Sequence, residues 1–159
     1  MKEELSIIIV NWNTRNLLKQ CLQSLDKHLT ELSYEIYVVD NGSADDSVAM
    51  VKDEFPRVKL IQNRLNLGFA RANNLAMRSA NARFLLLLNS DTIVKKGAIK
   101  GLMGTMQADP SIGIAGLQLL NEDGSLQNSI CNFPSLLTEL TNKSLLRLLL
   151  PSMYPGKEH

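Results

Sequence analysis

Short apolar runs alternate with amphipathic segments along most of the chain. The runs at residues 6–10, 35–39, 58–61 and 84–88 consist mainly of Ile, Val and Leu. Apolar runs of this length are typical of strands that are covered on both faces, as in a parallel sheet. A shorter run at residues 112–115 predicts a fifth strand, and residues 117–128 predict a hairpin that turns at Asp123 and Gly124.

The segments between these runs space their apolar residues as helices do. Four helices are predicted, at residues 14–28, 45–54, 69–79 and 96–108. Asn13 and Thr14 are suitable N-caps for the first helix, and Asp109 with Pro110 ends the last one. Strand and helix therefore alternate about four times, which predicts an α/β fold with a Rossmann-like, open and mostly parallel sheet that carries helices on both faces.

Polar residues stand where the strands are predicted to end. They are Asn11, Asp40 with Asn41, Asn63, and Asn89 with Asp91. In open parallel sheets, ligands bind outside the carboxyl ends of the strands, near the point where the strand order reverses. We therefore expect these side chains to converge on one ligand site.

The two strand-end aspartates each fit a ligand-binding role and a structural role. Asp40 can accept hydrogen bonds from a ribose hydroxyl or a base N–H, and Gly42 permits a close approach of the backbone. Asn89 and Asp91 are two residues apart, so on an extended chain they point the same way and can offer oxygen ligands to a hard divalent cation. Alternatively, each aspartate closes a turn or caps the next helix, and the local sequence leaves both alternatives open.

Gly68 precedes a predicted helix within the segment 66–74. A helix N-terminus can face an anionic group, and Arg71 could add a cation there. Asn is unfavourable in a helix interior, so Asn73 and Asn74 predict buried hydrogen bonds to a neighbouring loop.

Composition and missing motifs argue against several classes of protein. The net charge of +1 disfavours binding to nucleic acid. The sequence lacks G-x-G-x-x-G after its first strand, G-x-x-x-x-G-K-[ST] and G-x-S-x-G, which argues against dinucleotide dehydrogenases, P-loop NTPases and α/β-hydrolases. Cys21 and Cys131 have no CxxC spacing, and we interpret them as reduced core thiols.

The lengths of the apolar segments predict the cellular location of the protein. The N-terminus lacks the pattern of a signal peptide, and no apolar stretch reaches the ~18 residues of a membrane span. This indicates a cytoplasmic protein, with peripheral contact with the inner face of the membrane as an alternative. Residues 136–150 are leucine-rich and predict a helix. That helix either packs on further sequence or lies on a membrane or partner surface, including that of a second copy in a homo-oligomer.

Five segments follow one another in a specific order and spacing. They are residues 6–13 (SIIIVNWN), 37–43 (YVVDNGS), 66–74 (NLGFARANN), 86–91 (LLLNSD) and 116–134, which contains Asp123-Gly124 and Cys131 to Pro134. Each segment alone is a weak signal. Together they resemble the family-2 glycosyltransferases, and among these the rhamnosyltransferase-like branch, over nearly the whole chain.

The resemblance implies a GT-A fold that binds a UDP- or dTDP-sugar together with a divalent cation, Mg²⁺ or Mn²⁺. By the family pattern, Asp40 contacts the base, and Asn89 takes the place of the first acid of an Asp-x-Asp motif. The site is then one negative charge short. The nucleotide-sugar site that the resemblance implies consists of Val10, Asn11, Asp40, Asn63, Gly68, Arg71, Asn89 and Ser90, with Asp91 as the metal ligand.

The resemblance also implies a reaction. Such enzymes transfer the sugar with inversion to a saccharide or lipid-linked acceptor, as in cell-envelope polysaccharide synthesis, and a carboxylate base takes the acceptor's proton. In the family that base follows a Gly-Gly-Phe-Asp-like segment, an arrangement that does not occur in this sequence. We therefore expect residues 1–134 to be the donor-binding domain and residues 135–159 to lead to an absent acceptor half, so that the chain alone is inactive. The alternative is a non-catalytic nucleotide-sugar-binding, oligomerisation or membrane-contact module.

Overall fold

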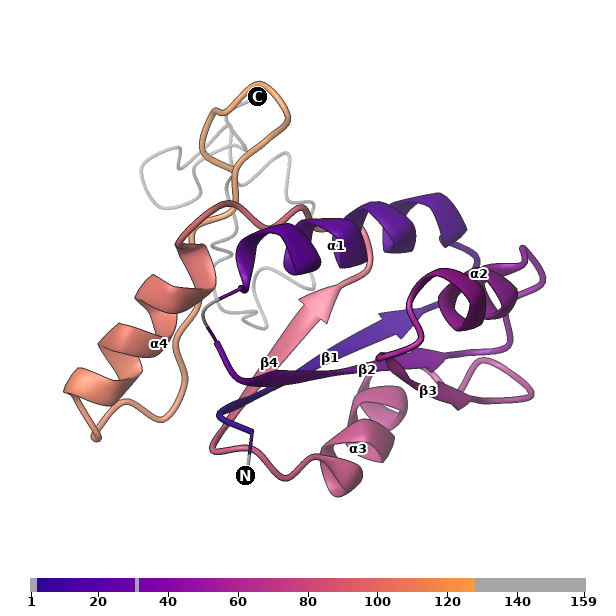
Figure 1. Ribbon diagram of the computed structural model, residues 1–159, viewed down its shortest axis with the longest axis horizontal. Coiled ribbons are helices and arrows are strands. Elements are labelled where there is room, and N and C mark those ends of the chain that lie inside the picture. Colours follow the sequence, from indigo (N-terminus) through magenta and orange to yellow (C-terminus); the bar gives the residue numbers. More distant parts are fainter. Residues whose placement is uncertain (1–2, 31, 128–159) are drawn as a thin grey trace, which may run out of the picture. The chain divides into compact units, whose positions relative to one another are not determined.

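The computed structural model describes residues 3–30 and 32–127 (Figure 1). By its contacts the chain divides into two units, Met1–Ala115 and Gly116–His159. The helices and strands of the described residues all lie in the first unit. In chain order they are β1 (Leu5–Asn11), α1 (Arg15–His28), β2 (Tyr34–Asp40), α2 (Ser47–Glu54), β3 (Lys59–Gln62), α3 (Phe69–Ser79), β4 (Phe84–Asn89) and α4 (Ala98–Ala108).

The four strands form one sheet in the order β3-β2-β1-β4, and each neighbouring pair is parallel. The chain builds outward from β1 to β3 and then returns to the other side of β1 to add β4. The strand order therefore reverses at the junction of β1 and β4. Helices lie on both faces of the sheet, so the predicted α/β fold is confirmed (Figure 1).

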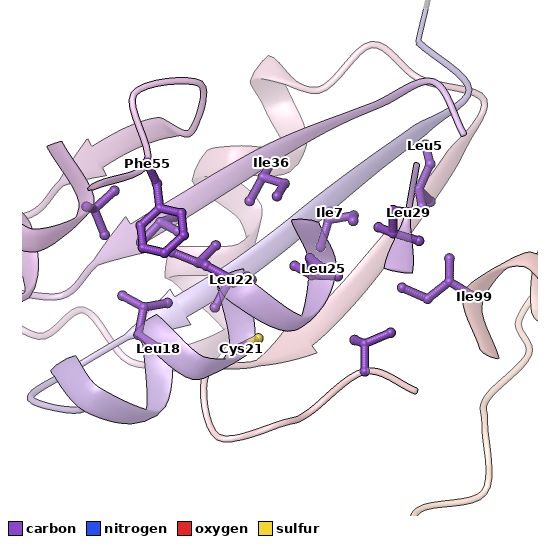
Figure 2. Close-up of a cluster of buried hydrophobic side chains, with 14 of the residues drawn as sticks. Leu5, Ile7, Leu18, Cys21, Leu22, Leu25, Leu29, Ile36, Phe55 and Ile99 are labelled. Atoms are coloured by element: carbon purple, nitrogen blue, oxygen red, sulfur yellow. The ribbon is translucent and has the colours of Figure 1, made fainter. Parts of the chain in front are cut away.

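Successive residues of β1 face opposite sides of the sheet, as strand geometry requires. Ile7 and Ile9 belong to the larger core, which also includes buried side chains of α1, α2 and α4 (Figure 2). Ile8 belongs to a smaller core, to which α3 contributes Ala72 and Ala76. Because alanine side chains are short, α3 packs closely on β1 and β2, and this fixes its first turn beside the strand ends.

The prediction of a fifth strand is wrong, and the predicted hairpin forms only in part. Residues 112–115 form no strand, and the side chain of Ile114 is 94% exposed. The hairpin is reduced to one antiparallel bridge between Leu120 and Leu126. The run at 112–115 is only four residues long and contains Gly113, which adds no side chain to pack. Strand preference depends on such packing, so a short run that remains exposed lacks what would hold it in a sheet.

The helix boundaries agree with the predictions to within a few residues. α4 begins at Ala98 rather than residue 96, because Gly97 has a φ of +79°, which a right-handed helix does not contain. Cys21 is a buried free thiol, as predicted. Cys131 and the expected helix at 136–150 lie outside the described residues, and the boundary drawn after residue 134 stays a prediction. Among the helices of the described part, none is both long and apolar enough to cross a membrane.

Candidate functional site

The register of the sheet brings the polar strand ends together. Asn11 of β1 is paired with Asp40 of β2, and Val10 of β1 is paired with Asn89 of β4. On the outer side Asp40 is paired with Gln62, directly before Asn63. The expected convergence at the carboxyl edge of the sheet therefore exists, and its centre is the β1–β4 junction where the strand order reverses.

Asp40 lies at the centre of a buried hydrogen-bond network. Asn11 is fully buried and Asp40 is 2% exposed. The Asn11 Nδ2 group donates to Asp40 Oδ1 at 2.9 Å and lies 3.0 Å from Ser43 Oγ. The backbone N–H of Ser43 donates to Asp40 Oδ2 at 2.9 Å, which closes the turn after β2. Asp40 therefore closes the turn after β2, as its structural interpretation predicts. Its ligand-binding role stays a prediction, for which each carboxylate oxygen retains capacity to accept one more hydrogen bond.

A second chain of bonds leads from Asn11 across the β1–β4 junction. Thr14 Oγ1 donates to Asn11 Oδ1 at 2.7 Å, and it lies 2.9 Å from Ser90 Oγ. Thr14 stands at the N-cap position of α1, but its side chain makes no capping bond there, so the predicted capping role is wrong. Its hydroxyl instead links Asn11, at the end of β1, to Ser90 in the loop that follows β4.

The loop after β4 is attached to α1 through its backbone. Cys21 Sγ lies 3.7 Å from the carbonyl oxygen of Asn89, and the backbone N–H of Val94 donates to Ser24 Oγ at 3.0 Å. Burial, together with the negative charge of Asp91, raises the pKa of the Cys21 thiol to about 12. Cys21 is therefore protonated at neutral pH and acts as a structural group beneath the loop.

The side chains of Asn89 and Asp91 are exposed at this edge. Within residues 3–30 and 32–127, the Asp91 carboxylate makes no hydrogen bond or ion pair, and no group of three His, Cys, Asp or Glu side chains forms a metal cluster. An unengaged carboxylate with a nearby amide oxygen fits a hard cation that takes its remaining ligands from a diphosphate and water. Asp91 could hold such an ion, with Asn89 as a neutral second ligand.

A ladder of asparagines fastens the loop after β3 to the turn after β2. Asn63 Nδ2 donates to Asn41 Oδ1 at 2.9 Å, and Asn41 Nδ2 donates to Asn66 Oδ1 at 3.2 Å. Asn66 Oδ1 also accepts the backbone N–H of Gly68 at 2.8 Å, directly before α3 begins. Asn41 is buried, so this ladder fixes the first turn of α3 relative to Asp40.

Gly42 allows the same two segments to meet. Its φ is +78°, and a Cβ at this position would lie 3.1 Å from Leu65 Cα and 3.2 Å from the carbonyl group of Arg64. The close approach expected at Gly42 is therefore real, but the group that approaches within the chain is the backbone of the 64–65 loop.

The first turns of α3 only partly match the predictions. Arg71 is exposed and lines a shallow depression with Arg78 on the outer side of the helix, so its place at a nucleotide stays a prediction. Asn73 Nδ2 donates to the carbonyl of Phe69 in its own helix, and Asn74 is exposed. The expected bonds from Asn73 and Asn74 to a neighbouring loop are therefore wrong. Among the described residues, the buried Asn73 Oδ1 has no hydrogen-bond partner.

Sequence reasoning missed the linking roles of Thr14, Ser43 and Asn66. Thr14 lies three residues after Asn11, and Ser43 lies three residues after Asp40. A short hydroxyl side chain three residues after a polar strand end can fold back on it, which is the available signal. The bond between Thr14 and Ser90 joins residues 76 positions apart, and local sequence contains no sign of it.

Comparison with known proteins adds a family and a fold. The family described as Glycosyl transferase family 2 matches residues 6–153. Glycosyltransferase GlyG of Streptococcus pneumoniae serotype 4 is 31% identical over 121 residues, which cover 71% of this chain and 39% of GlyG. The first curated relatives are matched over 39%, 29% and 22% of their lengths, so the chain spans well under half of each.

Two solved structures share the arrangement of the described elements. TarS residues 1–349 of S. aureus, in complex with UDP-GlcNAc, has a TM-score of 0.58 and 26% identity over 66% of this chain and 31% of that one. The mannosyltransferase PcManGT from Pyrobaculum calidifontis, in complex with GDP-Man and Mn²⁺, has a TM-score of 0.63 over 71% of this chain and 34% of that one. Its identity is 20%, so this second likeness concerns the fold alone.

Proposed function

The chain belongs to glycosyl transferase family 2, and we propose that it binds the nucleotide-sugar donor of a sugar-transfer reaction. The observation that carries the proposal is the buried Asp40–Asn11–Ser43 network beside the exposed Asn89–Asp91 pair, at the carboxyl edge where the strand order reverses. A nucleoside diphosphate needs both parts, because its base and ribose require fixed hydrogen-bond partners and its diphosphate requires a cation.

We assign the nucleoside to the β1–β2 side of this edge. The lone pairs that Asp40 does not use within the chain can accept a base N–H or a ribose hydroxyl proton. Asn11 and Ser43 hold the carboxylate in one orientation, so little freedom is lost when the ligand binds. Val10 precedes Asn11 and Asn63 follows the next strand end, and both complete the expected lining.

We assign the diphosphate to the β4 side. Asp91 would hold the Mg²⁺ or Mn²⁺, with Asn89 or a water molecule beside it, and Ser90 is kept in place by Thr14. A divalent ion there would neutralise the charge that develops on a departing diphosphate. We also assign an anion contact to the first turn of α3, which begins directly after Gly68, because the backbone N–H groups of a helix N-terminus can face an anion.

We further propose that the donor is a UDP- or dTDP-sugar and that the sugar passes with inversion to a saccharide or lipid-linked acceptor. UDP-GlcNAc in the TarS structure supports a uridine nucleotide, and Mn²⁺ in the PcManGT structure supports a divalent cation. We assign no catalytic base among residues 3–30 and 32–127, because the base that the family resemblance implies follows a Gly-Gly-Phe-Asp-like segment, which this sequence lacks. The domain so defined would supply donor binding for synthesis of an envelope polysaccharide.

Calorimetry on the full 159-residue chain tests the assignment. UDP, dTDP and GDP would each be titrated with MnCl₂, with MgCl₂ and with EDTA. We expect UDP or dTDP to bind more tightly with a divalent ion than with EDTA. Failure of all three nucleotides to bind under every condition would disprove the proposal.

A matched pair of variants on β2 tests the role of Asp40. Asp40→Asn removes the charge at the carboxyl end of β2 and should weaken nucleotide binding about tenfold or more. Glu35→Gln makes the same change near the amino end of the same strand, where Glu35 accepts bonds from Ser6 and Lys59. It should leave the nucleotide affinity unchanged. Equal losses in both variants would show that Asp40 acts only through stability.

A further inference from the structure

Charge is distributed unevenly along this nearly neutral chain. Between Phe55 and Ser90 there are six Lys or Arg residues and no Asp or Glu. The chain as a whole carries a net charge of only +1, so the residues outside this segment together carry a net charge of −5. The positive charge is therefore concentrated in the part of the fold that contains β3, α3 and β4.

Four of these residues bracket or lie on α3. Arg64 lies in the loop before the helix, Arg71 and Arg78 lie on it, and Arg83 lies between the helix and β4. Arg71 and Arg78 are seven residues apart, so they share one side of the helix. With Leu67, Asn74 and Leu75 they line a shallow depression, and we call these five residues the arginine face.

The four arginines are exposed, and none of them forms an ion pair with an acidic side chain of residues 3–30 or 32–127. Within the described part of the chain, the ion pairs involve Lys19, Arg57 and Lys59 instead. Arg83 stacks on the ring of its neighbour Phe84 at 4.9 Å. Four unneutralised cations around one short helix form an attractive surface for a polyanion.

Leu67 and Leu75 line the depression together with Arg71 and Arg78, and further apolar side chains are exposed elsewhere around α3. The side chain of Leu65 is 62% exposed and that of Phe69 is 56% exposed. Leu85 and Leu87 of β4 are also exposed, and they alternate with Leu86 and Leu88, which pack on the α1 side. They therefore lie on the face of the sheet that carries α3.

We propose that the arginine face, with Arg64 and Arg83 at its ends, docks on a bilayer that contains anionic phospholipid. Arg71 and Arg78 meet lipid phosphates while Leu67 and Leu75, which line the same depression, enter the headgroup boundary, and this mixture is typical of an interfacial surface. Single-stranded nucleic acid would instead favour a platform of several stacked aromatic rings, and Phe69 is the sole aromatic residue of α3.

The position of α3 gives this contact a consequence. Its first turn is tied to the carboxyl edge of the sheet through Asn66 and Asn41, and Arg83 directly precedes the start of β4 at the opposite edge. A bilayer along α3 would lie beside the edge at which we place the donor. A lipid-linked acceptor would then reach the donor without leaving its membrane. The docking itself does not depend on the proposed function.

Vesicle sedimentation with the full chain tests the contact. Wild type is expected to sediment with vesicles of phosphatidylcholine containing phosphatidylglycerol, but not with vesicles of phosphatidylcholine alone. Arg78→Glu/Arg83→Glu, which leaves Arg71 intact, should lower the partition coefficient by about tenfold or more, because each basic residue near an anionic surface contributes substantially to binding. Lys95→Glu/Lys96→Glu is the matched control, since it reverses two exposed charges outside this region and should retain binding.

Several outcomes would overturn the proposal. They are no binding of wild type to phosphatidylglycerol vesicles, equal binding of the two double variants, and equal binding to neutral vesicles. Release from the vesicles by equimolar single-stranded RNA would assign the surface to nucleic acid and would also overturn it. UDP titrations of the same variants separate this result from the donor-site proposal, because loss of docking with normal UDP affinity concerns the lipid contact alone.

Discussion

At the carboxyl ends of β1 and β2 the polar side chains are buried and bonded to one another, whereas at the end of β4 they are exposed. Asn11 and Asp40 are almost fully enclosed, and each makes side-chain hydrogen bonds inside the fold. Asn89 and Asp91 are exposed, and within the described residues neither side chain makes a hydrogen bond. The polar side chains at this edge are therefore buried and hydrogen-bonded on β1 and β2, but exposed on the neighbouring strand β4.

The difference indicates how the two sides would meet a ligand. Buried, satisfied groups keep one geometry and lose little entropy when a ligand arrives, which suits recognition of a nucleoside. Exposed carboxylates keep their hydration until a cation and a diphosphate replace it, which suits a site completed by its ligand. The hydroxyl of Thr14 joins the two sides through Asn11 and Ser90.

The largest expected effect concerns the two strand-end asparagines. Asn11→Ala removes the one hydrogen bond that the Asn11 side chain makes with each of Asp40, Ser43 and Thr14. Because Asp40 Oδ1 is then buried and unpaired, the free energy of unfolding should fall by about 3 kcal/mol. Asn89→Ala makes the same change at the end of β4, where the side chain is exposed, and should cost less than about 0.5 kcal/mol. Urea unfolding of both variants measures the difference, and similar costs would show that the two sides do not differ.

A matched pair of glycines provides the next test. Gly42 and Gly97 have φ values of +78° and +79°, but only Gly42 has backbone atoms in the space that a Cβ would occupy. Gly97→Ala should cost only the strain of its backbone, about 1 kcal/mol, and Gly42→Ala should cost that strain plus the displacement of the 64–65 loop, about 2 kcal/mol in total.

Urea unfolding again provides the measurement for the glycine pair. Gly42→Ala should also weaken UDP binding, because the displaced loop carries Asn66 and the start of α3. A Gly42 variant as stable as the Gly97 variant would mean that the contact across the turn yields without cost.

Sequence reasoning located this edge because the information is local. Each strand is a short apolar run that ends at a polar residue, and the ends of parallel strands share one edge, so pattern alone predicted that Asn11, Asp40 and Asn89 converge. The binding roles of these residues and of Asp91 stay predictions. Residues 112–115 misled the same reasoning, since an apolar run of four does not reveal whether a neighbouring strand exists to pair with it.

The bonds between the segments were not predictable in this way. The asparagine ladder joins positions more than twenty residues apart, and the bond from Thr14 to Ser90 joins positions 76 apart. Asn and Thr at these positions fit turns and caps equally well, so their partners depend on register and helix placement. What the sequence indicates is where polar groups gather, and what the fold adds is which of them are already engaged.

A variant of Asp91 is expected to have the next smaller effect, and it tests the exposed side chains at the end of β4. Asp91→Asn should lower the affinity for UDP in the presence of Mn²⁺ about tenfold, or about 1.4 kcal/mol, and leave the affinity in EDTA and the unfolding free energy unchanged. Asp53→Asn on α2 is the control for loss of one exposed carboxylate. If Mn²⁺ strengthens UDP binding to the Asp91 variant as much as to wild type, Asp91 is not a cation ligand.

The smallest effect concerns Asp45, which lies in the loop after β2 and holds the first turn of α1. Its carboxylate accepts the backbone N–H of Arg15 at 2.8 Å and the hydroxyl of Ser47 at 2.5 Å. Burial favours the neutral acid, but the bonds from Ser47 and Arg15 outweigh it and lower the pKa of Asp45 below its usual 3.8. A carboxylate with a lowered pKa in the folded protein stabilises it above the unfolded pKa, and this contribution is lost as the pH falls through the folded pKa.

The Asp45→Asn variant should therefore unfold more easily than wild type at pH 6, by about 1 kcal/mol, and the two proteins should converge as the pH falls below 3.8. Asp46→Asn is the matched control, because Asp46 is the exposed neighbour and adopts a positive φ that asparagine tolerates. Its difference from wild type should stay small across the same range. Urea midpoints between pH 2.5 and 6 measure both variants. The contrary result is a difference in unfolding free energy between Asp45→Asn and wild type that stays constant over this range. That result would mean that the geometry of the turn, and not the charge of Asp45, holds the first turn of α1.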